Sequence, residues 1–272
     1  TTPRAHAHHS PGHAGTESLR TLASTGSEPT PRRRVALVTE FMSTTSEPTR
    51  NAAALGAVSI LGTWSLTPRL FVGAQAPFVL VDENVPGSEP MAGYGDTRFS
   101  GFFKLGDPND KKQTWTLGLN LTVPTRTIRY SADPGSQWLV SPLVAFTHAS
   151  EKFRVFAMVL TPLEMRPAGT ALELSPSVGA GYQVTPRFSA SMAVGADVRL
   201  LTWCSGPRGT SFCPDGRATE EARGLGTTRV SGNLTTWLSL SKIWAVFAAG
   251  QLPFTEHKDF AFGANLGVEA RF

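Results

Sequence analysis

The sequence is short of charge. Charged residues make up 17% of the 272 residues, well below the roughly 25% typical of soluble domains. Hydrophobic residues make up 40% and include 16 Phe and 6 Trp, and there are 26 Gly. This mixture is typical of antiparallel sheets with tight turns. An ordinary soluble domain does not account for so little charge.

The sequence also lacks a convincing membrane helix. Residues 51–68 (NAAALGAVSILGTWSLTP) carry no charge, but they include Asn51, Ser59, Thr63, Ser65 and two glycines. A membrane helix should offer about 20 predominantly apolar residues. We therefore expect this stretch not to be a transmembrane helix.

Features of several functional classes are missing. The net charge of +4 owes much to the first 34 residues, so the remainder is near neutral and nucleic acid is not an expected partner. The sequence has no Gly-rich phosphate loop, paired CxxC or nucleotide fingerprint. Outside the first 31 residues only His148 and His257 are histidines, and no Ser motif surrounds either. We therefore do not expect an enzyme.

Cysteine is scarce, with Cys204 and Cys213 the two present. They flank a stretch rich in Gly and Pro (CSGPRGTSFC). In an oxidising compartment they would form a disulfide that closes a loop, whereas in the cytosol they would be ordinary thiols.

Residues 1–31 differ in composition from the rest of the chain. They are rich in Ser, Thr, Pro, Gly and His, with few large apolar side chains, so we expect a flexible tail. No charged and apolar signal segment opens the chain, which fits a processed precursor or a trimmed chain. Four histidines of this tail could bind Cu or Zn, although a flexible cluster of this kind binds weakly; they are His6, His8, His9 and His13. We expect no other cofactor.

Residues 32–272 show alternating hydrophobicity. In the last segment, alternate residues from Phe260 to Phe272 are apolar, while the residues between them include Asp259, Glu269 and Arg271. A period of two over this length excludes an amphipathic helix and predicts a strand with one face suited to lipid and one to water. About twelve such segments are expected, at residues 33–42, 53–66, 70–81, 95–105, 113–124, 137–148, 152–162, 172–184, 187–201, 228–240, 243–252 and 258–272.

The connections between these segments alternate in length. Those after even-numbered segments are mostly short, and those after odd-numbered segments are generally longer, up to residues 202–227. Outer-membrane barrels have short periplasmic turns and long outer loops. The pattern therefore predicts an all-β, antiparallel, up-and-down transmembrane barrel in the bacterial outer membrane, with both termini in the periplasm. A soluble β-sandwich or lipocalin-like barrel is the alternative, but the small and charged residues opposite the apolar faces would then give it a polar core.

Several stretches resemble the outer-membrane proteins named after the MetA pathway of phenol degradation. Residues 93–96 (GYGD) before an alternating strand, 117–125 (LGLNLTVPT) and 178–191 (VGAGYQVTPRFSAS) are similar to motifs of that family, although Arg126 stands where it has a glycine. The resemblance implies a barrel, an outer-membrane location and transporter-like function for small or hydrophobic compounds.

The water-facing positions carry both charge signs and could either line a selective channel or fill an occluded interior with ion pairs. The first possibility predicts a channel for small solutes; the second predicts a structural barrel that binds a partner protein through its outer loops or tail. The lipid bilayer and the barrel assembly machinery are further expected partners, with Phe272 as an aromatic assembly signal. The predicted lining residues are Glu40, Asp96, Arg98, Lys104, Arg154, Glu173, Asp197, Arg199, Arg229, Asp259, Glu269 and Arg271.

Overall fold

The described part of the protein consists of β-strands joined by turns and loops. This computed structural model describes residues 33–45, 52–82, 89–107, 112–128, 138–166, 169–204, 228–255 and 262–272. The strands are β1 (Arg33–Thr45), β2 (Ala52–Ser65), β3 (Leu70–Asp82), β4 (Met91–Tyr94), β5 (Thr97–Leu105), β6 (Gln113–Val123), β7 (Trp138–Ala149), β8 (Phe153–Leu160), β9 (Leu163–Arg166), β10 (Gly169–Gln183), β11 (Phe188–Cys204), β12 (Arg229–Ser239), β13 (Trp244–Pro253) and β14 (Phe262–Arg271).

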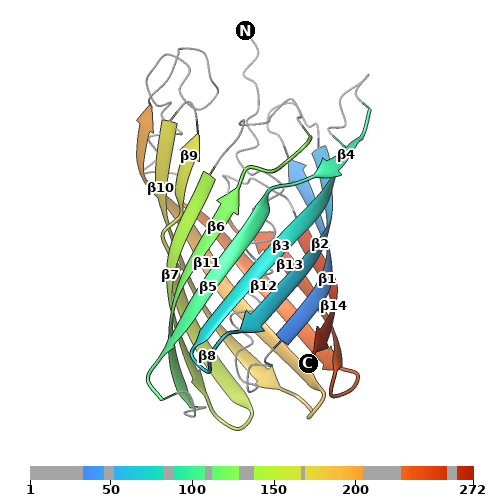
Figure 1. The fold of residues 1–272 in the computed structure, drawn as a ribbon, viewed down its shortest axis with the longest axis vertical. Coiled ribbons are helices and arrows are strands. Elements are labelled where there is room, and N and C mark those ends of the chain that lie inside the picture. The colour runs from blue at the N-terminus through green and yellow to red at the C-terminus, as the bar shows by residue number, and fades with distance from the viewer. Residues whose placement is uncertain are drawn as a thin grey trace.

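The strands form one closed antiparallel barrel of twelve strand positions (Figure 1). The segments β4 and β5 share one position beside β3, and β8 and β9 share one position between β7 and β10. The first strand closes the ring on the last, in a register that places Arg34 opposite Arg271. The predicted all-β fold class and number of strands are therefore confirmed. The region taken for a strand rather than a membrane helix is indeed β2.

Two strand positions contain a break that the alternating pattern did not predict. Residues 95–96 separate β4 from β5, and the backbone N–H of Gly95 donates to the Pro77 carbonyl at 2.9 Å. At the second break, Pro162 has no N–H to donate to the neighbouring strand. The predicted strands 95–105, 152–162 and 172–184 were therefore wrong in their limits. The strand predicted at 95–105 lacks β4, the strand predicted at 152–162 ends within the second break and lacks β9, and the strand predicted at 172–184 begins after the first residues of β10.

The short turns lie at one end of the barrel, which we call the short-turn end. Four of them connect strands over residues 66–69, 150–152, 184–187 and 240–243. The carboxyl end of the chain lies at this same end (Figure 1). The prediction of short connections was right here. The connection before β10, predicted to be longer, spans only residues 167–168 because β9 and the start of β10 occupy the remainder.

The barrel interior contains apolar as well as polar side chains, so the face opposite the lipid-facing wall is not uniformly polar. One buried group consists of Ala36, Val38, Leu61, Trp237, Ala245 and Phe247. A second consists of Met42, Leu55, Ala57, Val79, Val81 and Ile128. These residues alternate with exposed apolar residues, so several strands are apolar on both faces and their inner face could not be recognised from hydrophobicity alone.

In the described residues, no helix is long and apolar enough to cross a membrane.

Candidate functional site

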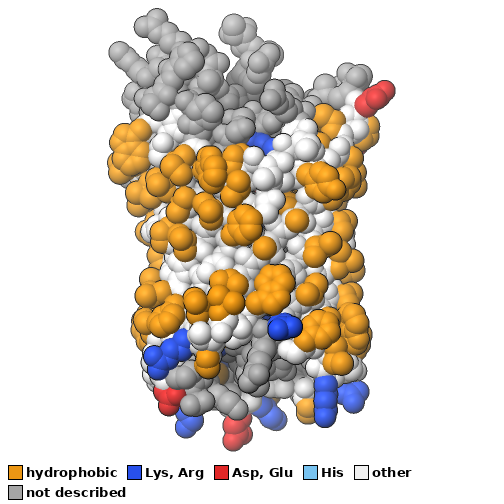
Figure 2. Space-filling model, in the orientation of Figure 1, with side chains coloured by type: hydrophobic (Ala, Val, Ile, Leu, Met, Phe, Trp, Pro, Cys, Tyr) orange, Lys and Arg blue, Asp and Glu red, His pale blue; other side chains and the backbone are white. Residues whose placement is uncertain are grey.

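The outer wall of the barrel is almost free of charge. Within the described strands, the exposed charged residues are Arg33, the first residue of β1, and Asp82, the last residue of β3. The rest of the wall exposes apolar side chains such as Leu37 (52% exposed), Ile60 (62%) and Leu266 (62%). Figure 2 shows this hydrophobic surface on one side, with most of the Lys and Arg side chains toward the lower, short-turn end and acidic side chains at both ends. Because a charge on a lipid-facing wall costs up to about 2–4 kcal/mol, this surface suits lipid.

Exposed aromatic residues lie at both ends of the strands. Those near the short-turn end include Trp64, Trp115, Phe153, Tyr182 and Trp244. Those toward the opposite end are Tyr94, Trp138, Trp203, Phe254 and Phe262. Two aromatic girdles that bound an apolar band are the surface pattern of transmembrane barrels.

The predicted lining residues that the structure describes all lie on the strand face opposite this apolar wall, or at a break beside it. Five are buried: Glu40, Asp96, Arg98, Arg199 and Glu269. Six are of intermediate burial: Lys104, Arg154, Glu173, Asp197, Arg229 and Arg271. Asp259 lies outside the described residues. Whether these side chains line a conducting path remains a prediction.

The first group of interior charges joins the two ends of the barrel sheet. Glu269 on β14 is fully buried, and its Oε1 lies 3.3 Å from Arg34 Nε on β1 and 2.5 Å from Arg271 Nε. The Arg271 guanidinium also lies 5.9 Å from the ring centroid of Trp237. One carboxylate therefore interacts with two cations in the interior.

A second ion pair lies on β10 and β11. Arg199 Nη2 and Nε donate to Glu173 Oε1 at 2.6 and 3.0 Å. The two residues are register partners, and a shift in register begins next to Glu173. The pair is therefore held directly across two adjacent strands.

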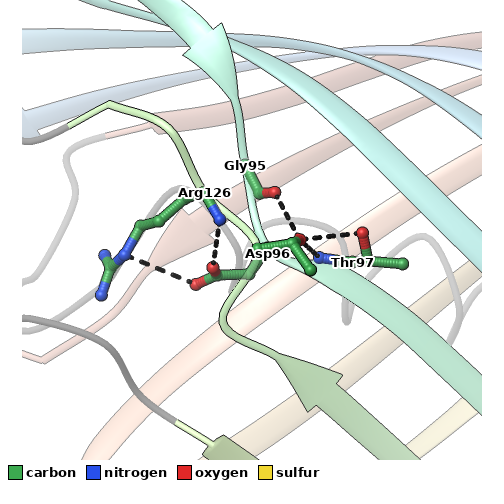
Figure 3. A network of polar contacts seen from close by, with 5 residues as sticks. Gly95, Asp96, Thr97 and Arg126 are labelled. Carbon is green, nitrogen blue, oxygen red and sulfur yellow. Dashed lines mark hydrogen bonds and ion pairs between the residues drawn. The ribbon is translucent and has the colours of Figure 1, made fainter.

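The third group lies at the break between β4 and β5 (Figure 3). The backbone N–H of Arg126 donates to Asp96 Oδ1 at 3.2 Å, and Arg126 Nε lies 3.8 Å from Asp96 Oδ2. Beside them, Thr125 Oγ1 accepts from the backbone N–H of Thr97 at 2.8 Å and donates to the Gly95 carbonyl at 3.1 Å. The two motifs at residues 93–96 and 117–125, together with Arg126, thus meet at this break.

Next to this group lies a set of buried polar residues that we call the polar belt: Ser59, Gln75, Arg98, Ser100 and Asn120. Gln75 is the register partner of Arg98, and Ser100 is that of Asn120. Arg98 interacts electrostatically with Glu40 and Asp96. The buried atoms Ser59 Oγ, Gln75 Oε1, Arg98 Nε and Nη1, Ser100 Oγ and Asn120 Oδ1 have no hydrogen-bond partner in the described structure.

Several interior polar residues were missed from the sequence. Arg34 and Arg126 bind predicted residues, and Glu164 and Gln75 are buried at 5% and 2% exposure. Arg34 lies an even number of residues from Glu40 in β1, and Gln75 lies an even number from Val79 in β3, so each points to the same inner face as its partner. Alternation within these two strands could therefore have identified Arg34 and Gln75 as interior residues. Arg126 follows β6 rather than lying in it, so no alternating pattern could place it.

Three predictions fall wholly or partly outside the described residues. His6, His8, His9 and His13 are not described, and neither are Cys213 and the side chain of Cys204. The flexible tail of residues 1–31 is untested for the same reason. In the described ranges, no group of three or more His, Cys, Asp or Glu could hold a metal ion.

No family model and no curated protein sequence matches the chain. Solved structures do match. An outer membrane channel from Pseudomonas putida F1 shares 15% identity at a TM-score of 0.67, over 90% of this chain and 96% of that one. The CymD monoaromatic hydrocarbon channel shares 10% identity at 0.53, over 94% and 92%. The KdgM porin shares 7% identity at 0.54, over 88% and 99%.

At these identities the similarity establishes the fold, which is that of outer-membrane β-barrels. The neighbours are described as channels and porins. The chain is similar to them in architecture.

Proposed function

We propose that this protein is a channel of the bacterial outer membrane that passes small solutes through the interior of its barrel. The observation that carries the proposal is the polar belt, whose buried donors and acceptors lack partners within the described protein. Each such atom costs about 1–3 kcal/mol when left unsatisfied. Water or a passing polar solute would remove that cost, whereas a permanently dry interior would not.

The outer surface supports the membrane location. In the described part of the chain, exposed charge is confined to strand ends, turns and loops, and aromatic residues such as Trp64 and Trp203 lie toward opposite ends of an apolar wall. The short turns fit the periplasmic side, which would place the chain end at Phe272 in the periplasm. The channels among the solved structures support the same class of function by analogy of fold.

We further propose that the solutes are small or hydrophobic compounds. The resemblance of residues 93–96 and 117–125 to the family named after the MetA pathway suggests small or hydrophobic compounds. The CymD neighbour is described as a channel for monoaromatic hydrocarbons. The interior combines both chemistries: the apolar group that contains Phe247 also contains Trp237, and Arg271, which pairs with Glu269, lies over the Trp237 ring.

A second candidate is a structural barrel with an occluded interior that binds a partner protein. The buried ion pairs favour it: Glu269 with Arg34 and Arg271, and Glu173 with Arg199, are what a filled barrel interior needs. In that case the outer loops or the tail would provide the binding surface.

Conductance distinguishes the two candidates. The purified protein would be reconstituted in a planar lipid bilayer, and single-channel current and flux of uncharged solutes into vesicles would be measured. The channel proposal expects discrete current steps or solute flux above that of protein-free bilayers. A folded, inserted protein that gives neither would contradict the proposal and favour the structural barrel.

A further inference from the structure

Four short turns share a sequence pattern. Each begins with Thr or Ser, carries Lys or Arg at the second or third position, and ends with a large apolar residue. They are residues 67–70 (TPRL), 150–153 (SEKF), 185–188 (TPRF) and 241–244 (SKIW). All four lie at the short-turn end.

The hydroxyl group at the start of each turn fixes its backbone. It accepts hydrogen bonds from backbone N–H groups two or three residues later, as Thr and Ser commonly do in turns. Thr67 Oγ1 accepts from the backbone N–H groups of Arg69 and Leu70 at 3.2 and 3.0 Å, and Thr185 Oγ1 accepts from those of Arg187 and Phe188 at 3.3 and 3.0 Å. Ser241 Oγ accepts from the backbone N–H groups of Ile243 and Trp244 at 3.1 and 3.0 Å. Ser150 Oγ accepts from the backbone N–H of Phe153 at 3.2 Å. The backbone carrying each basic residue is therefore ordered in advance.

The basic residues of these turns belong to a larger set that we call the basic ring. It consists of Arg33, Arg69, Lys112, Lys152, Arg187 and Lys242, all of them exposed. Two exposed acidic residues, Asp107 and Glu151, accompany them in the described part of this end. Figure 2 shows the basic side chains around its lower rim. The short-turn end thus has an excess of positive charge.

The basic residues lie beside exposed apolar side chains of the outer wall. Arg33 is the register partner of Trp64, which is 41% exposed. Lys152 precedes Phe153, and Lys242 precedes Ile243, which are 50% and 47% exposed. Lys and Arg in this setting lay their alkyl stems along apolar surface and extend the charge to the lipid headgroups.

We propose that the basic ring binds the phosphate groups of anionic phospholipids in the leaflet at the short-turn end. This inference rests on the membrane location proposed above, but not on conduction. The electrostatic free energy that a basic residue gains near an anionic membrane surface is enough to favour an anionic lipid over a neutral one roughly fivefold. The proximity to lipid-facing apolar residues favours lipid over a free anionic solute as the ligand.

The test measures which lipid contacts the protein in vesicles. The full chain would be inserted into phosphatidylcholine vesicles in which a fixed minor fraction of lipid is either brominated phosphatidylglycerol or brominated phosphatidylcholine. Bromine quenches nearby tryptophan, and Trp64 and Trp244 lie next to the ring. We expect stronger quenching by the anionic lipid, decreasing as NaCl shortens the screening length.

Two matched variants isolate the ring. In the first, Arg69→Gln, Lys152→Gln, Arg187→Gln and Lys242→Gln are combined, and the excess quenching should disappear. In the second, Arg69→Lys, Lys152→Arg, Arg187→Lys and Lys242→Arg keep the charge, and the excess should persist. The interior substitution Lys104→Gln removes one charge without touching the ring and should also leave the excess intact.

Three results would overturn the inference. They are equal quenching by both lipids in an inserted protein, an excess that survives the four Gln substitutions, and an excess abolished by inorganic phosphate but not by chloride of equal ionic strength. The last would identify a site for free phosphate. Quenching by neither lipid would instead contradict the membrane location, so failure of the proposed location and failure of the ring are distinguishable.

Discussion

Arg34 Nε lies 3.3 Å from Glu269 Oε1, across the seam where the first strand of the barrel meets the last. Glu269 is fully buried and also binds Arg271. The seam closes the sheet between segments from the two ends of the described chain. A single carboxylate thus compensates two interior cations at the position where the barrel closes.

Glu269→Gln should destabilise the barrel by on the order of 3 kcal/mol, because it removes the buried carboxylate charge that buried Arg34 and partly buried Arg271 contact. The loss would be measured as a lower midpoint of urea-induced unfolding in detergent micelles. Glu151→Gln, in an exposed turn, is the matched control and should change the midpoint little. Equal midpoints for Glu269→Gln and the wild type would show that the seam does not depend on this carboxylate.

Arg98 and Glu40 should set ion selectivity if the interior conducts, because they are buried charges of opposite sign that interact. Arg98→Gln should shift the reversal potential in a salt gradient toward cation selectivity, and Glu40→Gln should shift it toward anion selectivity. The double variant should return near the wild-type value. In unfolding experiments, the pair should show a coupling energy of about 0.5–3 kcal/mol. Unchanged selectivity in both single variants would place the ion path elsewhere.

Gly267→Ala should destabilise the barrel by about 1–3 kcal/mol. A Cβ at this position would overlap the ring of Phe247, which stacks on Trp237 with a centroid separation of 4.6 Å. Gly250→Ala is the matched control, because a Cβ there meets nothing within 4 Å. The two variants would be compared by the temperature at which the barrel loses its heat-resistant mobility in gel electrophoresis. Similar temperatures would mean that the Phe247 ring moves aside at little cost.

Deletion of Phe272 should reduce the amount of assembled barrel, because an aromatic carboxyl terminus resembles the signal for outer-membrane insertion. The side chain is 68% exposed, and the backbone N–H donates to the Arg33 carbonyl at 2.9 Å. Heat-modifiable protein in isolated outer membranes is the readout. Phe272→Tyr keeps an aromatic ring and should assemble normally. Undiminished assembly after the deletion would rule out a signal role.

The histidines of the first residues are predicted to bind Cu(II) or Zn(II). The prediction concerns His6, His8, His9 and His13, which lie outside the described residues. Titration of either metal into the full chain and into a chain without residues 1–16 should show uptake that depends on the segment. Equal, weak uptake by both chains would leave the histidines without a metal-binding role.

The sequence by itself determined the strands and their approximate number. Alternation is a local property of an extended backbone, so Trp115, Leu117 and Leu119 reveal a strand without knowledge of its neighbours. The same property placed Glu40 and Glu269 on a non-lipid face. It also identified the short connections around Thr67 and Thr185.

Only the tertiary structure decided which strands interrupt their pairing and which charges meet. The break at Gly95 depends on how two segments share one partner strand, and the Asp96–Arg126 contact depends on that break. The contact of Arg34 with Glu269 exists only because the barrel closes. The buried apolar groups likewise result from closure of the barrel. Closure brings together the inner faces of strands that are distant in the sequence, and the alternating pattern within one strand gives no information about those contacts. Local periodicity therefore specified the strands, whereas ring closure and register specified the candidate site.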